Sequence, residues 1–169
     1  MLSRGFDPKR IAVAGESAGG GLAIAMLVSL RDGGVSMPAC LWCSSPWVDL
    51  EAIGGSMSTK AAVDPLIQKP YLMELADAYL HGADPRMPAA SPIYADPRGL
   101  PPLLIQVGSA ETLLDDALRL AGVAGAADVR VTLEVWPDMF HAWHLFYQQL
   151  AMGRLALAQV GAFFRSHFA

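Results

Sequence analysis

The sequence predicts an α/β fold in which helices flank a mostly parallel sheet of about four strands. From Arg10 onward, short apolar runs alternate with longer helical stretches, an order typical of strands joined by helical crossovers. Apolar residues make up 53% of the 169 residues and charged residues only 17%, so the chain has enough apolar side chains for a buried core. Because it shows no internal repeat or inter-domain linker, we expect a single domain over residues 1–169.

The N-terminal third contains the first two predicted strands. Residues 11–14 predict a strand, and residues 20–30 predict the helix that follows it. The glycine pair at 33–34 predicts the end of that helix. Residues 39–44, an apolar run, predict the second strand.

The second strand contains the only two cysteines of the sequence, Cys40 and Cys43, in a CxxC spacing. Residues three apart in a strand face opposite sides, so the two thiols should diverge. The chain has no second CxxC or CxxH that could complete a zinc site. We therefore expect neither a redox centre nor a metal site here.

A proline-rich connection at about 46–101 separates the second strand from the third. Its one clear helix is predicted to begin at Pro70 and to end near Leu80, before Gly82. Connections of this length carry function or cover a site. We interpret it as a cap-side or connecting insert near the ends of the strands.

The C-terminal part returns to the regular alternation. Residues 103–107 and 129–136 predict the third and fourth strands, with a helix at 113–124 between them. A long terminal helix is predicted over residues 145–168. In such a sheet the ligand site lies outside the carboxyl ends of the strands.

The stretch GESAG, Gly15 to Gly19, matches G-x-S-x-G between the first strand and its helix. A sharp turn there presents Ser17 as a nucleophile, and Gly15 and Gly19 let neighbouring backbone pass closely. The N–H of Ala18, at the start of the helix, is placed to donate to an oxyanion. The motif therefore predicts serine chemistry at the end of the first strand.

A serine nucleophile needs a base, and the sequence offers four histidines. His141 lies in the loop after the fourth strand, at the same end of the sheet as Ser17, and is the predicted base. His144 belongs to the next helix in this interpretation and stays as an alternative. His81, before a helix-ending glycine, and His167, in the last helical turn, are expected to be solvated or capping.

The base in turn needs a carboxylate that fixes its tautomer. Glu111 follows the third strand by a short loop and is the predicted acid. Asp115 and Asp116 lie in the first turns of the next helix, where the helix dipole favours acids without any catalytic role. Asp49, after the second strand, remains a rival.

Four stretches carry a resemblance to the hormone-sensitive-lipase-like branch of the α/β-hydrolases, the bacterial family IV carboxylesterases. They are DPKRIAVAGESAGGGLA, SPWVDL, SPIYADPRGLPPLLIQVGSAETLLDDA and WPDMFHAWHLF. The chain order Ser17, Glu111, His141 is the order of nucleophile, acid and histidine that α/β-hydrolases use. The resemblance implies a partial α/β-hydrolase fold and hydrolysis of short-acyl esters through an acyl-serine, without cofactor or metal.

The sequence departs from the family pattern at a few positions. Ala142 stands where relatives commonly have glycine, and Glu111 stands where many have aspartate. Asp115 matches the second acid of the family motif, which is usually structural. No HGG occurs in the sequence, and only residues 1–9 precede the nucleophile strand, so the HGGG oxyanion loop and most of the cap have no counterpart.

Two expectations follow from that difference. Loss of an oxyanion donor typically costs about 10² to 10³ in rate, so activity should be impaired. The first strand should also have an open edge, which favours a homo-oligomer or a partner chain. The alternative hypothesis is a catalytically impaired remnant or interaction module that self-association or a partner completes.

The charge pattern excludes other classes of partner. The net charge of −4 comes from scattered acids, and no run of Lys or Arg suggests nucleic acid or an anionic membrane. The longest apolar run near the N-terminus, residues 23–30, is too short to span a bilayer. We expect a cytoplasmic protein that acts on a small-molecule ester.

Overall fold

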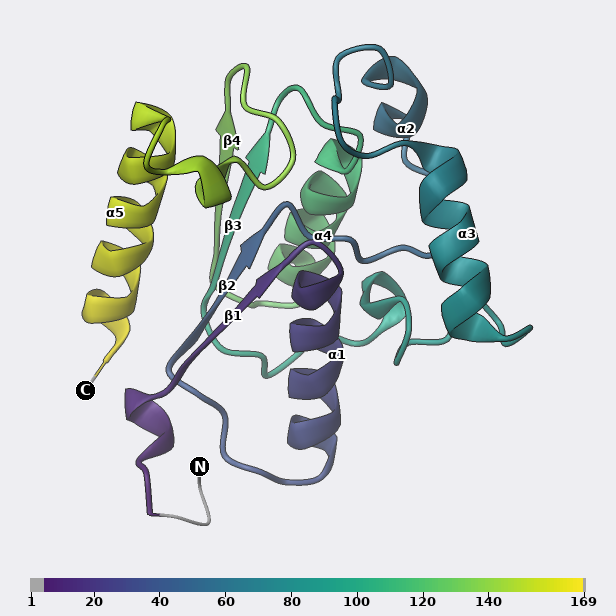
Figure 1. Cartoon of the computed structure of the whole chain (residues 1–169). Helices are drawn as coiled ribbons and strands as arrows, with labels where there is room; N and C mark the ends of the chain where they lie inside the picture. Colours follow the sequence, from purple (N-terminus) through teal and green to yellow (C-terminus); the bar gives the residue numbers. More distant parts are fainter. Residues whose placement is uncertain (1–4, 169) are drawn as a thin grey trace.

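The structure, a computed structural model, describes residues 5–168 and contains one four-stranded sheet (Figure 1). The strands are β1 (Ala12–Glu16), β2 (Cys40–Ser44), β3 (Leu103–Gly108) and β4 (Val131–Trp136). The α-helices are α1 (Ala18–Asp32), α2 (Ser56–Thr59), α3 (Lys69–Leu80), α4 (Leu114–Ala126) and α5 (Ala151–His167). Short 3₁₀ helices are η2 (Pro8–Arg10), η3 (Pro92–Tyr94) and η4 (Trp143–Phe146). The strand order is β1-β2-β3-β4 and every pair is parallel, which confirms the predicted fold class.

Helices cover both faces of this sheet. Figure 1 shows α1 and α4 on one face and α5 on the other. The main core lies between the sheet and the α1–α4 layer, where Leu27, Ile105 and Leu120 are almost fully buried. Because all four strands are parallel, their carboxyl ends lie at one edge of the sheet, and the loops after them meet there.

The 46–101 insert forms its own small hydrophobic cluster. Trp47, Met57 and Leu72 of the insert pack with Leu113, the residue directly before α4. In Figure 1, α2 and α3 lie on the outer side of the α1–α4 layer, near the carboxyl ends of the strands. The insert is therefore packed onto the domain beside the predicted site.

The predicted terminal helix was wrong at its start. Residues 143–146 form the separate 3₁₀ helix η4, and α5 begins only at Ala151, after Leu150 adopts an extended backbone. The buried side chains of Trp143 and His144 hold η4 against the sheet, so the chain has to turn before α5 can start. The other predicted helices and strands start and end within two residues of their predicted positions, whereas the short helix α2 in the insert was not predicted.

No helix within residues 5–168 combines the length and the apolar character that crossing a membrane requires.

Candidate active site

Ser17 occupies a strained turn between β1 and α1. Its backbone has φ 54° and ψ −124°, a conformation that costs a non-glycine residue about 1 to 3 kcal/mol. Hydrogen bonds hold the turn: the Ser17 N–H donates to the Ser44 carbonyl, and the Ser17 carbonyl accepts from the Trp47 N–H at 3.0 Å. The tight turn projects the serine beyond the end of β1.

The glycines around this turn differ in what they permit. A Cβ on Gly15 would collide with the Gly19 carbonyl, so Gly15 is required for the turn. A Cβ on Gly19 would meet nothing within 4 Å among the described residues, which contradicts the prediction that Gly19 allows close backbone passage. That part is played by Gly20 and Gly21, against Pro46 and the Trp47 carbonyl.

Ala18 is the first residue of α1. The first N–H groups of a helix have no acceptor within the helix, so the Ala18 N–H is free to donate beside Ser17. If the Ser17 hydroxyl attacks a substrate carbonyl, negative charge develops on the substrate oxygen. The Ala18 N–H and the positive end of the helix dipole would stabilise that charge.

The structure brings Glu111 and His141 into direct contact. His141 Nδ1 lies 3.0 Å from Glu111 Oε2, and both side chains are buried. A carboxylate oxygen accepts this bond and Nδ1 donates it, so in the unprotonated form of the ring Nε2 is the acceptor nitrogen. This is the tautomer that a general base needs, because Nε2 is then free to take a proton.

His141 also lies close to the end of β1. Its Nε2 is 3.5 Å from Oε1 of Glu16, the residue directly before Ser17. Among residues 5–168, no hydrogen bond joins the Ser17 hydroxyl to His141. Burial lowers the pKa of His141, but the hydrogen bonds and charges of Glu111 and Glu16 outweigh it and raise the pKa to about 9.

His144, the alternative base, has both ring nitrogens occupied. Nε2 donates to Oε1 of Gln106 at 2.9 Å, which leaves Nδ1 to accept from the Ser44 hydroxyl at 2.8 Å. Burial lowers the pKa of His144 to about 4, so the ring is neutral near pH 7. The ring also packs on Trp143 in the core, with ring centroids 3.9 Å apart. Its geometry is that of a core residue.

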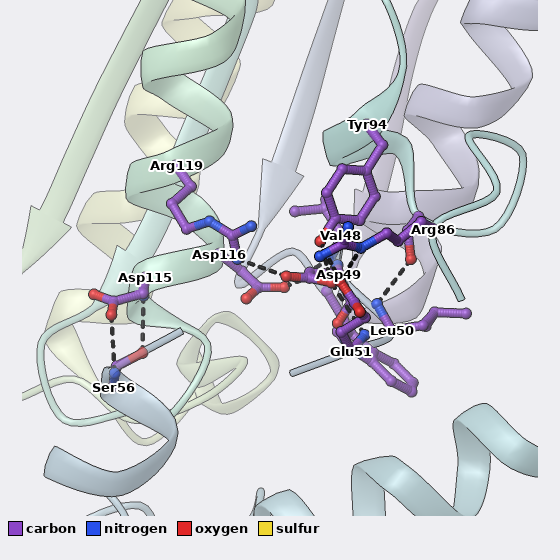
Figure 2. Close-up of polar contacts among 12 residues, drawn as sticks. Val48, Asp49, Leu50, Glu51, Ser56, Arg86, Tyr94, Asp115, Asp116 and Arg119 are labelled. Carbon is purple, nitrogen blue, oxygen red and sulfur yellow. Dashed lines mark hydrogen bonds and ion pairs between the residues drawn. The ribbon is translucent and has the colours of Figure 1, made fainter. Parts of the chain in front are cut away.

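The rival acids are held by other partners, as Figure 2 shows. Asp49 forms an ion pair with Arg119 at 2.6 Å and accepts from the Glu51 N–H. Asp115 accepts from the Ser56 N–H at 2.9 Å. Asp116 accepts from the N–H groups that follow β2, at Val48 and Asp49, and burial raises its pKa to about 7. None of these contacts is directed at His141.

The remaining histidines and the cysteines lie away from this cluster. His81 is exposed and ends α3 in a left-handed conformation, with φ 47°. His167 contacts the Phe163 carbonyl one turn earlier in α5. Cys40 and Cys43 are buried free thiols, and burial raises the pKa of each.

Two features of the site have only a faint signal in the sequence. One is Ser45, the residue before the proline in SPWVDL. Its hydroxyl contacts Glu111. The other is an apolar pocket of about 360 Å³ beside the start of α1. Its wall comes from α1, the start of the insert and α3, with lining residues that include Ala18, Gly19, Trp47, Leu50, Leu75 and Tyr79. Finding it required the packing of α3, which local sequence patterns do not give.

Comparisons with known proteins identify the family to which this fold belongs. The profile of a family described as alpha/beta hydrolase fold matches residues 2–145. An acetyl-hydrolase from Streptomyces hygroscopicus is 49% identical, and the match covers 98% of this chain and 56% of that protein.

Two solved structures are also similar. One is an esterase from the bacterial hormone-sensitive lipase (HSL) family, 51% identical with a TM-score of 0.98, covering 99% of this chain and 57% of that chain. The other is EstE5 in a crystal soaked by p-nitrophenyl butyrate, 46% identical with a TM-score of 0.96, covering 99% and 56%. The chain thus spans a little over half the length of these relatives. A profile match over most of its residues and a superposable fold, with a serine turn and a Glu–His pair at one sheet edge, place the chain in the alpha/beta hydrolase fold family, among its bacterial hormone-sensitive lipase members.

Proposed function

We propose that this chain carries the serine machinery of a carboxylic ester hydrolase that acts on short-acyl esters. Ser17 is the nucleophile, His141 the base and then the acid, and Glu111 the carboxylate that orients His141. The observation that carries the proposal is the buried Glu111–His141 pair, whose Nε2 faces the end of β1 beside the strained Ser17 turn.

The chemistry follows from these positions. The Ser17 hydroxyl oxygen attacks the ester carbonyl carbon while its proton passes to His141 Nε2, and the Ala18 N–H donates to the resulting oxyanion. The carbon–oxygen bond to the alcohol then breaks, and His141 returns the proton to the leaving alcohol. A water molecule repeats the sequence on the acyl-serine, releases the acid and restores the Ser17 hydroxyl.

The pocket supports a short acyl or alcohol group. It begins at Ala18 and Gly19, directly after the nucleophile, and its walls are mostly apolar. A small apolar pocket beside a reactive serine favours a substrate with a short hydrocarbon chain. The acetyl-hydrolase name of one relative and the p-nitrophenyl butyrate soak of another agree with that size.

Covalent labelling tests the proposal. A fluorophosphonate probe should label the wild-type protein at Ser17, and Ser17→Ala should abolish labelling while Ser58→Ala, at an exposed serine of α2, keeps it. Hydrolysis of p-nitrophenyl acetate should be lost in parallel. A folded wild-type protein that the probe does not label at Ser17 would rule the mechanism out.

A further inference from the structure

Ser45, the residue directly after β2, connects the two members of the acid–base pair. Its hydroxyl lies 2.9 Å from Oε1 of Glu111 and 3.1 Å from the backbone nitrogen of Ala142. The Ala142 N–H can only donate, so the hydroxyl accepts from it and gives its single proton to the Glu111 carboxylate. One side chain thus joins the acid to the backbone directly after the base.

The two oxygens of the Glu111 carboxylate have different hydrogen-bond partners. Oε1 accepts from Ser45 and from the Gly108 N–H at 2.5 Å, whereas Oε2 accepts from His141. Two donors on one oxygen fix the rotation of the carboxylate about its last bond. This rotation decides where Oε2 lies, and therefore how the His141 ring is oriented.

The backbone holds Ser45 in place at a cost. Ser45 has φ 44° and Ala142 has φ 56°, so both residues bonded through this hydroxyl occupy the left-handed region that L-residues rarely adopt. The Ser45 N–H donates to the Gln106 carbonyl at 2.8 Å, and the side chain is fully buried. Strained backbone of this kind persists only where the surrounding contacts hold it in place, as they do at Ser45 and Ala142.

We propose that Ser45 is a positioning residue for the Glu111–His141 pair, a proposal that rests on the function proposed above. It fixes the carboxylate of Glu111 and the backbone after His141 in one bridge, so that Nε2 is presented toward Ser17. Ser45 has no contact with the reacting atoms in this proposal, and it acts only through the pair.

The neighbouring Ser44 offers a matched control. It is also fully buried, and its hydroxyl also contacts a histidine, but that histidine is His144 of the core. Removing either hydroxyl leaves a buried group without its hydrogen bond and should lower stability by similar amounts. Only the loss at Ser45 should reach the acid–base pair.

The test compares Ser45→Ala and Ser45→Gly with Ser44→Ala in the full 169-residue chain. Glycine lacks the hydroxyl but tolerates the positive φ, so it keeps the test open if Ser45→Ala folds poorly. Both Ser45 variants should slow fluorophosphonate labelling of Ser17 about 10- to 100-fold at saturating probe, with unchanged probe affinity. Ser44→Ala removes only the hydroxyl and keeps the backbone carbonyl that accepts from the Ser17 N–H, so it should label within about threefold of the wild type.

Two further measurements separate positioning from general loss of structure. In a Glu111→Gln background, Ser45→Gly should cause little further slowing, because the group that it positions is already impaired. The downfield proton NMR signal of His141 Nδ1–H should shift or broaden in Ser45→Gly and stay in place in Ser44→Ala. Labelling of both Ser45 variants at the wild-type rate, or additive losses with Glu111→Gln, would overturn the inference. Absence of wild-type labelling would instead count against the proposed function.

Discussion

At the scale of single residues, the site depends on glycines at which neighbouring backbone occupies the space that a Cβ atom would need. Gly15 is one such place, and Gly108 is another, because a Cβ there would collide with the Met139 carbonyl in the loop that carries His141. Close approach at Gly15 shapes the serine turn, and close approach at Gly108 brings the acid loop and the histidine loop together. These glycines determine geometry although neither performs chemistry.

Gly15→Ala and Gly19→Ala form a matched pair for testing this view. Gly15→Ala should destabilise the protein by about 3 kcal/mol or more, because the new methyl group overlaps backbone that cannot yield. Gly19→Ala should be neutral or stabilise by up to about 1 kcal/mol, because Gly19 lies in the first turn of α1 with open space around it. Urea unfolding measures both. Equal effects of the two substitutions would contradict the assignment.

The pair of carboxylates around His141 predicts a pH dependence. Burial lowers the pKa of His141, but Glu111 at Nδ1 and Glu16 near Nε2 raise it to about 9. A base works only when unprotonated, so the rate of Ser17 labelling should rise with pH until about pH 9. Glu16→Gln removes one carboxylate and should move the midpoint to lower pH.

The labelling rate of Ser17 against pH, measured for the wild type and Glu16→Gln, checks this prediction. Glu74→Gln, at an exposed position of α3, provides a control with the same change of charge. Its midpoint should stay at the wild-type value. A Glu16→Gln profile that is unchanged or moves upward would show that Glu16 does not act on His141.

At the scale of elements, the insert and the loop that carries Glu111 are bonded to each other. Asp64 of the insert accepts from the N–H and the hydroxyl of Thr112, the residue after Glu111, through Oδ2. Its Oδ1 accepts from the N–H groups of Leu66 and Ile67, so one buried carboxylate closes a turn and anchors the acid loop. Ser56 adds a second link, donating to the Thr112 carbonyl.

Asp64→Ala should therefore affect both stability and rate. Four hydrogen bonds to the carboxylate are lost and buried N–H groups lose their acceptor, so unfolding should become easier by about 2 to 4 kcal/mol. The freed acid loop should also slow labelling of Ser17. Asp77→Ala, at an exposed position of α3, should change stability by less than about 0.5 kcal/mol. Urea unfolding with labelling of each variant decides this, and wild-type values for Asp64→Ala would count against the anchor.

The elements also show which features of the structure can be predicted from local sequence patterns and which cannot. The four strands and the motif GESAG were predictable, because apolar runs, turn glycines and strand-end positions are local signals. The break before α5 was not, because it depends on His144 contacting Ser44, 100 positions away in the chain. Ser45 was missed for the same reason, since its partners Glu111 and Ala142 come from two other strand ends. Residues that act through such distant contacts have no periodicity to reveal them.

At the scale of the whole molecule, β1 is paired on one side only within residues 5–168. Ile11 accepts from Ala39 of the β2 side and Ser17 donates to Ser44, so odd-numbered residues of this segment bond to β2. The backbone groups of Ala14 consequently point to the other edge. Exposed edges of this kind pair readily with another chain.

A protein of these 169 residues should therefore self-associate through β1. Ala14→Pro removes a donor from the open edge and leaves the bonds to β2 intact, so it should shift the protein toward the monomer. Val13→Pro removes a bond to β2 instead and should unfold the sheet, which circular dichroism would show. Light scattering after size-exclusion chromatography measures the molecular mass of the folded variants. A wild type that is monomeric at every concentration, or an Ala14→Pro variant that associates as strongly as the wild type, would show that the β1 edge does not drive assembly.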